Sequence, residues 1–267
     1  MFSHFTLGSN NLARSEKFYS AALAPLDQFL THTSIDGAMY RYSLSDQSFP
    51  HLFIARPFDD LPATWSNGFH IAFNAKDSFA VDQFYAAALA NGGIDEGAPG
   101  LRPEYEADYY AAYVRDPDGN KLQAVCYTNG RSTGATGEVI SHITIGLADF
   151  QRERRFYRAV LAVLDIEELG DDDPDSMDFG YKGMDLPVIY VQPTFDGRPA
   201  TWGNGTHVAL TARSREQVDV FHQVALDNGG ICDGPPGLRP QYSENYYAAY
   251  IRDSVGNKLQ AVCREPC

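Results

Sequence analysis

The sequence has few cysteines, fewer basic than acidic residues, and no long apolar run. Four cysteines in 267 residues are too few for a disulfide scaffold, and none belongs to a CxxC pair. Lysine and arginine number 21 against 35 acidic residues, and the resulting net charge of −14 argues against nucleic acid and anionic membrane as partners. No apolar run approaches the roughly 18 residues of a membrane-spanning helix.

The N-terminal segment MFSHFTLGSNN also lacks the basic region and the apolar stretch of a signal peptide. Cys126 and Cys263 fall at core-facing positions of repeated strands, which favours buried, reduced thiols. Apolar residues at 44% and charged residues at 21% are typical of a globular chain. These features predict a globular, cytoplasmic protein.

A tandem repeat of about 137 residues runs through the chain. The segments SHFTLG, GFHIAFNA and YYAAYVRDPDGNKLQAVC return as SHITIG, GTHVALTA and YYAAYIRDSVGNKLQAVC. The period is too long for a solenoid unit, so we expect one domain at residues 1–128 and another at 138–267. The Gly/Ser/Thr-rich segment at 129–137 is the expected linker.

Each copy predicts the order strand, helix, several strands, and then the same order again. Apolar residues at helical spacing follow Asn11 over residues 12–23, and Pro25 ends that helix. A second helix is expected to start at Asp77 or Ser78 and to end at Asn91. The last two strands form a hairpin around an Asp/Gly/Asn turn. The sequence therefore predicts an α+β fold with four βαβββ modules, two in each domain.

Alternation along three strands of each copy places one polar residue opposite the apolar set. In the first copy these polar residues are His4, His70 and Gln123. The second copy repeats the pattern with the residues His142, His207 and Gln260. We therefore expect one trio of polar side chains on a shared sheet face in each half of the chain.

Two imidazoles and one oxygen donor can hold Fe, Mn, Zn or Ni as a divalent ion and leave positions open for substrate. Here the third member is an amide, whose carbonyl oxygen can ligate but brings no negative charge to offset the metal. The alternative is a set of hydrogen-bonded polar residues that line a cavity without metal. The residues alone leave both interpretations open.

Two further pairs of residues are expected near the cavity rim. Arg102 and Arg239, in the repeated GLRP loops, could bind a substrate carboxylate or phosphate, or could brace the loop through backbone carbonyls. Tyr113 and Tyr250 could act in catalysis by donating a hydrogen bond to an oxyanion, or could pack in the wall of the cavity.

At these motifs the sequence resembles the vicinal oxygen chelate superfamily of glyoxalases, bleomycin resistance proteins and extradiol dioxygenases. The resemblance rests on SHFTLG with ARSEKFY, on NGFHIAF and on RDPDGNKLQAV, each with a counterpart in the second half. It implies two tandem domains, each of paired βαβββ modules that form a curled mixed sheet around a cavity. It further implies that His4, His70, Gln123, His142, His207 and Gln260 are metal ligands.

The chain departs from the superfamily pattern at several positions. Gln123 and Gln260 replace the usual glutamate. The catalytic histidine that extradiol dioxygenases carry before the tyrosine of their signature is absent from PEYEADYY and PQYSENYY. The glutamate of glyoxalase I on the fourth strand is also missing from HLFIAR and PVIYVQ.

Two main functional hypotheses follow from the residues and the resemblance. The first is a metal-dependent lyase or isomerase of the glyoxalase-like group that acts on a small oxygenated molecule. The second is a metal-free protein that binds a small molecule or drug, as resistance proteins do. A dioxygenase-like enzyme is a further alternative. A small-molecule ligand is the expected partner, and the chain could work as a monomer or a homodimer because it already holds four modules.

Overall fold

The computed structural model of the protein describes residues 1–34, 39–43, 49–130, 139–170, 175–183 and 187–266. These residues form four modules, each with one strand, one helix and three further strands. Within the described residues, no helix is both long enough and apolar enough to cross a membrane. The predicted linker at 129–137 lies almost entirely outside the described residues.

The first half of the chain supplies modules 1 and 2. Module 1 contains β1 (Phe2–Gly8), α1 (Leu12–Leu23), the short 3-10 helix η1 (Ala24–Leu26), β2 (Phe29–Thr33), β3 (Met39–Ser43) and β4 (His51–Ala55). Module 2 contains β5 (His70–Asn74), α2 (Ser78–Ala90), β6 (Ile94–Leu101), β7 (Tyr109–Arg115) and β8 (Lys121–Tyr127).

The second half repeats this order in modules 3 and 4. Module 3 contains β9 (Ile140–Gly146), α3 (Phe150–Ala162), β10 (Ile166–Glu168), β11 (Met177–Tyr181) and β12 (Ile189–Gln192). Module 4 contains β13 (His207–Thr211), α4 (Arg215–Asp227), β14 (Ile231–Leu238), β15 (Tyr247–Arg252) and β16 (Lys258–Cys263).

The two helices of the first half begin and end where the sequence predicts. The side chain of Asn11 accepts a hydrogen bond from the backbone N–H of Arg14 at 3.1 Å, which caps α1. Asp77 caps α2 in the same way through the N–H of Ala80 at 2.8 Å. The helix α2 ends at Ala90, and Asn91 is its C-cap residue.

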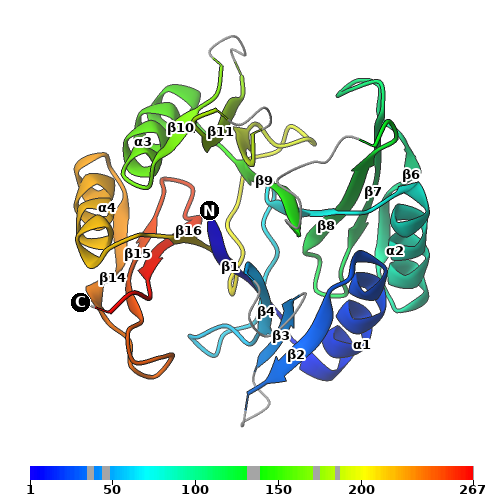
Figure 1. The fold of residues 1–267 in the computed structure, drawn as a ribbon, viewed down its shortest axis with the longest axis horizontal. Coiled ribbons are helices and arrows are strands. Elements are labelled where there is room, and N and C mark those ends of the chain that lie inside the picture. Colours follow the sequence, from blue (N-terminus) through cyan, green and yellow to red (C-terminus); the bar gives the residue numbers. More distant parts are fainter. Residues whose placement is uncertain (35–38, 44–48, 131–138, 171–174, 184–186, 267) are drawn as a thin grey trace.

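The strands form two eight-stranded mixed sheets, each from one module of either half. Sheet A has the order β14-β15-β16-β13-β1-β4-β3-β2 and joins modules 4 and 1. Sheet B has the order β10-β11-β12-β9-β5-β8-β7-β6 and joins modules 3 and 2. The antiparallel pairs β1–β13 and β5–β9 connect the modules. In Figure 1, strands from the C-terminal end of the chain (β13–β16) and from its N-terminal end (β1–β4) belong to one sheet.

The α+β fold of two domains, each of two βαβββ modules paired in a mixed sheet, is therefore confirmed. The expectation that modules 1 and 2 share a sheet, as the division at residues 128 and 138 implied, is wrong. The physical reason lies in the strand edge, since backbone N–H and C=O groups on β1 can pair with any strand of suitable register. Within each half, the modules are instead joined through their helices, α1 with α2 and α3 with α4.

Hydrogen bonds from buried tyrosines reinforce these contacts within each half. The hydroxyl of Tyr19 on α1 donates to Asp116 in the β7–β8 turn at 2.6 Å. Tyr157 on α3 donates to Asp253 in the β15–β16 turn at 2.7 Å. Burial raises the pKa of both carboxyl groups, although the hydrogen bonds oppose this rise. Each half is thus tied together by a buried polar contact as well as by packing.

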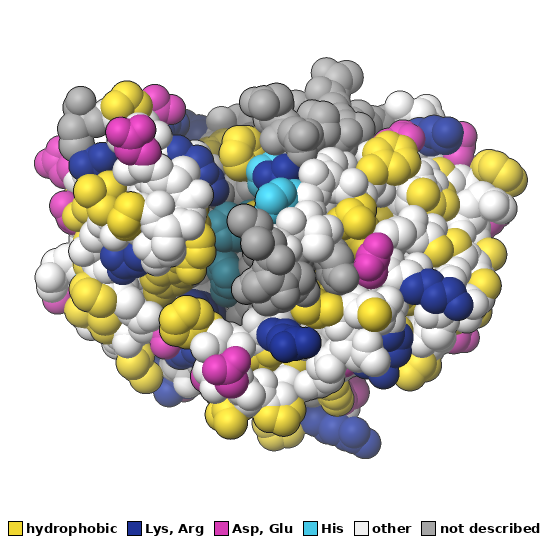
Figure 2. All heavy atoms as spheres, turned by 90° about the horizontal axis from the view of Figure 1, so that it is seen from below, with side chains coloured by type: hydrophobic (Ala, Val, Ile, Leu, Met, Phe, Trp, Pro, Cys, Tyr) yellow, Lys and Arg dark blue, Asp and Glu magenta, His cyan; other side chains and the backbone are white. Residues whose placement is uncertain are grey.

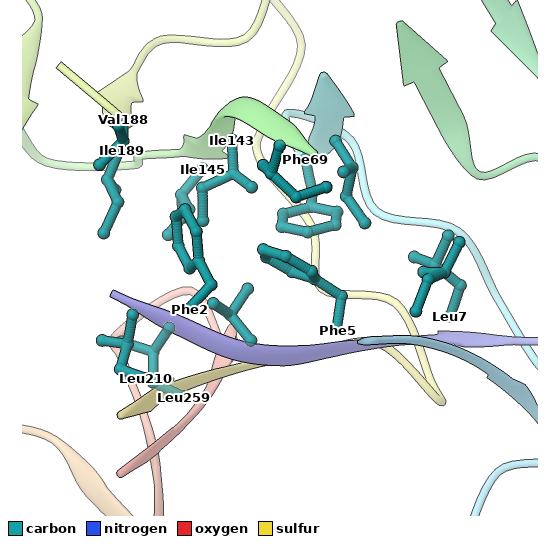
Figure 3. Packing of buried hydrophobic residues seen from close by; sticks show 14 of the residues in the cluster. Phe2, Phe5, Leu7, Phe69, Ile143, Ile145, Val188, Ile189, Leu210 and Leu259 are labelled. Atoms are coloured by element: carbon teal, nitrogen blue, oxygen red, sulfur yellow. The ribbon is translucent and has the colours of Figure 1, made fainter. Parts of the chain in front are cut away.

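The apolar faces of β1 and β9 meet between the two sheets. Figure 3 shows Phe2, Phe5 and Leu7 of β1 in the same cluster as Ile143 and Ile145 of β9. Phe5 and Leu7 are each 1% exposed, and burying such side chains contributes about 1.5–3 kcal/mol apiece. The central strands thus turn their apolar sides to the core, which leaves their polar side chains on the opposite face.

Candidate functional site

Site 1 consists of His4, His207 and Gln260 on the polar face of sheet A. These residues lie on the adjacent strands β1, β13 and β16. Ala209 of β13 is the register partner of both His4 and Gln260, and His207 lies two residues before it on the same face. The Nε2 atoms of His4 and His207 are 3.2 Å apart. Figure 2 shows histidine side chains recessed within a hollow of the molecular surface.

The hydrogen bonds of site 1 orient its three side chains. Ser3 Oγ lies 2.9 Å from His4 Nδ1, and this hydrogen bond fixes the orientation of the imidazole ring. The Gln260 amide donates through Nε2 to the Tyr246 hydroxyl at 2.7 Å. Oε1 of Gln260 is buried and makes no hydrogen bond of ordinary geometry among the described residues. It is nevertheless close enough to His207 to oppose the effect of burial on that imidazole.

Site 2 consists of His142, His70 and Gln123 on the polar face of sheet B. The rings of His70 and His142 have centroids 5.6 Å apart, and Ser141 Oγ lies 2.9 Å from His142 Nδ1. Here Gln123 Oε1 is 3.0 Å from Nε2 of His70, while its Nε2 donates to the Tyr109 hydroxyl at 2.6 Å. Site 2 therefore repeats site 1, with the glutamine carbonyl already engaged by a histidine.

The structure brings all six predicted polar residues into two trios, but the trios differ from those expected. His4 was expected to join His70 and Gln123, yet it lies with His207 and Gln260 in sheet A. His142 correspondingly joins the glutamine and histidine of the first half. The expected grouping by halves was wrong because it assumed that each half forms its own sheet.

All four imidazoles are poor bases in this environment. Burial lowers the pKa of His142 to about 4 and that of His207 to about 3, with Lys258 adding to the shift at His207. Burial likewise holds the pKa values of His4 and His70 well below the usual range, and the second histidine of each site adds to this effect. The rings are neutral at neutral pH, which is the state that binds a metal ion.

The donors of both sites suit a divalent ion. Two ligands with bonds of about 2.1 Å and an angle of about 90° to 110° lie about 3.0–3.4 Å apart. The distances of 3.2 Å at site 1 and 3.0 Å at site 2 have this value, which is also that of the hydrogen bonds these atoms form with each other. In the described part of the chain, no three His, Cys, Asp or Glu side chains form a metal-binding group. The third donor at each site would accordingly be the glutamine carbonyl.

Tyr113 and Tyr250 lie beside the two sites. Each is paired across its hairpin with the site glutamine, and each ring centroid is 6.3 Å from that of His70 or His207, respectively. Burial raises the pKa of both phenols, so they stay protonated at neutral pH. They are therefore placed to donate a hydrogen bond, and their catalytic role stays a prediction.

Arg102 and Arg239 each contact the backbone of the strand that immediately precedes them, β6 and β14 respectively. Arg102 donates to the carbonyl of Ala98 at 2.6 Å, and Arg239 donates to that of Pro235 at 2.7 Å. These are the loop-bracing contacts that formed the alternative to substrate binding. The Arg102 guanidinium also lies 5.8 Å from the centroid of the Tyr113 ring, so a role at the rim of site 2 stays a prediction.

Sequence reasoning missed the residues that differ between the two sites. On β4 of module 1, His51 is the parallel register partner of His4. Val188, just before β12 of module 3, takes the corresponding place beside His142, so site 2 has no histidine there. Arg264, which directly follows β16 in the second half, matches Tyr127, the last residue of β8 in the first. The alternation of apolar and polar residues that identified His4 also applies to these strands. It could therefore have identified both His51 and Arg264 as residues found at one site only.

Comparison with known proteins connects this geometry to one family. Residues 1–124 match the model of the Glyoxalase/Bleomycin resistance protein/Dioxygenase superfamily. A glyoxalase/bleomycin resistance protein from Albidiferax ferrireducens is 38% identical over 47% of this chain and 97% of its own, with a TM-score of 0.41. No curated protein gives a significant match.

Two longer structures cover almost the whole chain. Glyoxalase I from Zea mays aligns with 98% of this chain and 92% of its own at 19% identity, with a TM-score of 0.73. A candidate dioxygenase from Bacillus subtilis aligns with 99% of this chain and 85% of its own at 14% identity, with a TM-score of 0.63. The fold of four modules in two sheets is thus shared with these proteins. The family match and the duplicated motifs together mean that this chain belongs to the glyoxalase/bleomycin resistance protein/dioxygenase superfamily.

Proposed function

We propose that the protein is a metal-dependent lyase or isomerase that acts on a small oxygenated molecule. In this proposal His4, His207 and Gln260 hold one divalent ion, and His142, His70 and Gln123 hold a second. The observation that supports it most is the convergence of the His4 and His207 Nε2 atoms, 3.2 Å apart, beside the buried Oε1 of Gln260, which makes no hydrogen bond of ordinary geometry among the described residues. An unsatisfied buried carbonyl oxygen is costly unless a partner completes the site.

A divalent ion at such a site polarises the substrate oxygens bound to it. The residues of the chain supply the remaining functions. Ser3 and Ser141 orient the imidazoles, and Tyr246 and Tyr109 orient the glutamine amides. Tyr250 and Tyr113 donate hydrogen bonds to an oxyanion that develops on the substrate. Ala209 and Val262, both fully buried, form part of the apolar wall that limits water at site 1.

Metal analysis of protein purified without chelator or nickel resin tests this proposal. We expect about two divalent ions per chain, or uptake to that level when Zn, Fe, Mn or Ni is added. A content below about 0.2 ions per chain that no added metal raises would contradict it. The matched variants are His4→Ala for site 1 and His142→Ala for site 2, and each should remove one ion only.

A second candidate function is metal-free binding of a small aromatic molecule. Site 2 favours it in two respects. Its glutamine carbonyl is already bonded to His70, and the hydroxyl-bearing rings of Tyr109, Tyr113, Tyr127 and Tyr190 surround it. Thermal-shift measurements in EDTA separate the two functions, since stabilisation by aromatic compounds in the chelator supports metal-free binding. Stabilisation by divalent ions alone supports the metal-dependent enzyme.

A further inference from the structure

A cavity of about 570 Å³ opens at one end of the interface between the two sheets. Modules 1, 3 and 4 all contribute to it. Its walls include Phe2, Phe49, Ile140, Leu164, Val188 and Arg264. Figure 3 shows Phe2 and Val188 at one end of the packed interface. The volume falls within the range of about 300–1,000 Å³ that small-molecule sites occupy.

Arg264 is a charged group on this wall. It is half-buried, and no carboxylate lies within ion-pair distance of it among the described residues. Arg213, which also lines the cavity, is 74% exposed and paired with Asp165 at 3.1 Å. Glu265 lines the cavity too, but its side chain is exposed to solvent. A half-buried guanidinium without a counter-ion is unfavourable until an anion neutralises it.

Aromatic contacts and one hydrogen bond position this guanidinium. Its carbon atom Cζ lies 5.0 Å from the ring centroids of both Phe49 and Tyr246. One terminal nitrogen donates to Ser3 Oγ at 2.8 Å. These contacts leave further N–H groups of the planar fork available, and a carboxylate is the partner that the fork fits best.

We infer that this cavity binds a small monocarboxylate with an apolar tail, such as a medium-chain fatty acid or an arylalkanoate, and that Arg264 anchors its carboxylate. The apolar side chains Phe2, Ile140, Leu164 and Val188 receive the tail. The inference requires no metal and stands apart from the proposed reaction.

The same contacts connect the cavity to site 1 alone. Ser3 contacts both Arg264 and His4, and Tyr246 contacts both Arg264 and Gln260. In the other half of the repeat, the position of Arg264 is taken by Tyr127, which donates to Glu106 at 3.2 Å and so offers no cation. A bound carboxylate therefore lies next to one of the two sites and not to the other.

Isothermal titration of the full chain with octanoate tests the inference, and 1-octanol serves as the uncharged ligand of equal length. We expect saturable octanoate binding that weakens about 10- to 100-fold in Arg264→Gln, because a charge-assisted hydrogen bond is lost. Binding of 1-octanol should not change in that variant. Arg264→Lys should lose an intermediate part of the octanoate affinity. The control is Arg198→Gln, which should bind octanoate as wild type does because Arg198 is 82% exposed.

A second variant tests the volume of the cavity rather than its charge. Thr211 lines the cavity and is exposed, so Thr211→Trp should narrow it without disturbing the core and should weaken both octanoate and 1-octanol. This variant also covers the case in which Arg264→Gln fails to fold. Octanoate affinity unchanged in both variants would overturn the inference, and so would a wild-type protein without saturable binding up to about 10 mM.

Discussion

Nε2 of His4 lies 3.2 Å from Nε2 of His207, although 203 residues separate the two in the chain. The first comes from module 1 and the second from module 4, so neither half of the chain holds a complete site. The same is true of His70 and His142 at the other site. A ligand held at either site would therefore contact both halves of the chain.

This pairing predicts the pattern of metal loss in double variants. His4→Ala and His207→Ala should each lower the metal content from about two ions per chain to about one, and the double variant should also retain about one. By contrast, His4→Ala combined with His70→Ala should remove both ions, because those residues belong to different sites. Metal analysis of the four proteins measures this directly. A double variant His4→Ala/His207→Ala that lost both ions would contradict the pairing.

Replacing Gln260 by glutamate should have opposite effects with and without metal. With metal, the added charge should tighten binding about 10- to 100-fold. In EDTA, the buried carboxylate lacks a counter-ion and should lower the free energy of unfolding by about 1–3 kcal/mol. Urea unfolding with and without Zn²⁺ measures both effects. The control is Gln260→Met, which should weaken metal binding. If Zn²⁺ does not change the free energy of unfolding of Gln260→Glu, the result would argue for a metal-free site.

The buried hydrogen bond from Tyr19 to Asp116 should be worth more than its exposed counterparts. Tyr19→Phe removes a 2.6 Å donor from a buried carboxylate, so we expect the free energy of unfolding to fall by about 1–3 kcal/mol. Tyr247→Phe removes a 2.7 Å bond to Asp219 at the surface and should cost less than about 0.5 kcal/mol. Denaturant unfolding compares the two variants. Equal losses would show that burial does not determine the contribution.

Acid should destabilise the metal-free protein from about pH 6.5 downward. An unfolded histidine binds a proton below about pH 6.5, whereas burial keeps the pKa of His142 near about 4 and that of His207 near about 3. Unfolding thus takes up protons, and the free energy of unfolding should fall by about 1.4 kcal/mol per pH unit for each such histidine. Below the pKa of each histidine in the folded state, the folded protein binds the proton too, so that histidine no longer contributes to the slope.

Unfolding in EDTA between about pH 6.5 and 5 measures this slope, before most carboxylates titrate. His142→Gln removes one titrating group, so its mean slope over this range should be smaller than that of wild type by about 1 kcal/mol per pH unit. A wild-type slope near zero would show that the imidazoles are protonated in the folded state.

Much of the local structure followed from residue patterns. The caps at Asn11 and Asp77, the hairpin turns, and the apolar parity of Phe5 and Leu122 are all determined by short-range interactions. The two GLRP arginines show the limit of this approach, since a guanidinium can bind either a ligand or its own backbone. Arg102 bonds to the carbonyl of Ala98, a contact that depends on the irregular path of β6 between Gly97 and Gly100.

The repeated sequence by itself determined the module order, the face on which each strand carries its polar residue, and the imidazole and amide chemistry of the sites. Only the tertiary structure decided that β1 pairs with β13 and that β5 pairs with β9. All four modules offer similar backbone edges, so no local feature distinguishes the possible partners. The choice depends on how the apolar faces of β1 and β9 pack together and how the helices of each half meet. Those interactions exist only once the whole chain has folded.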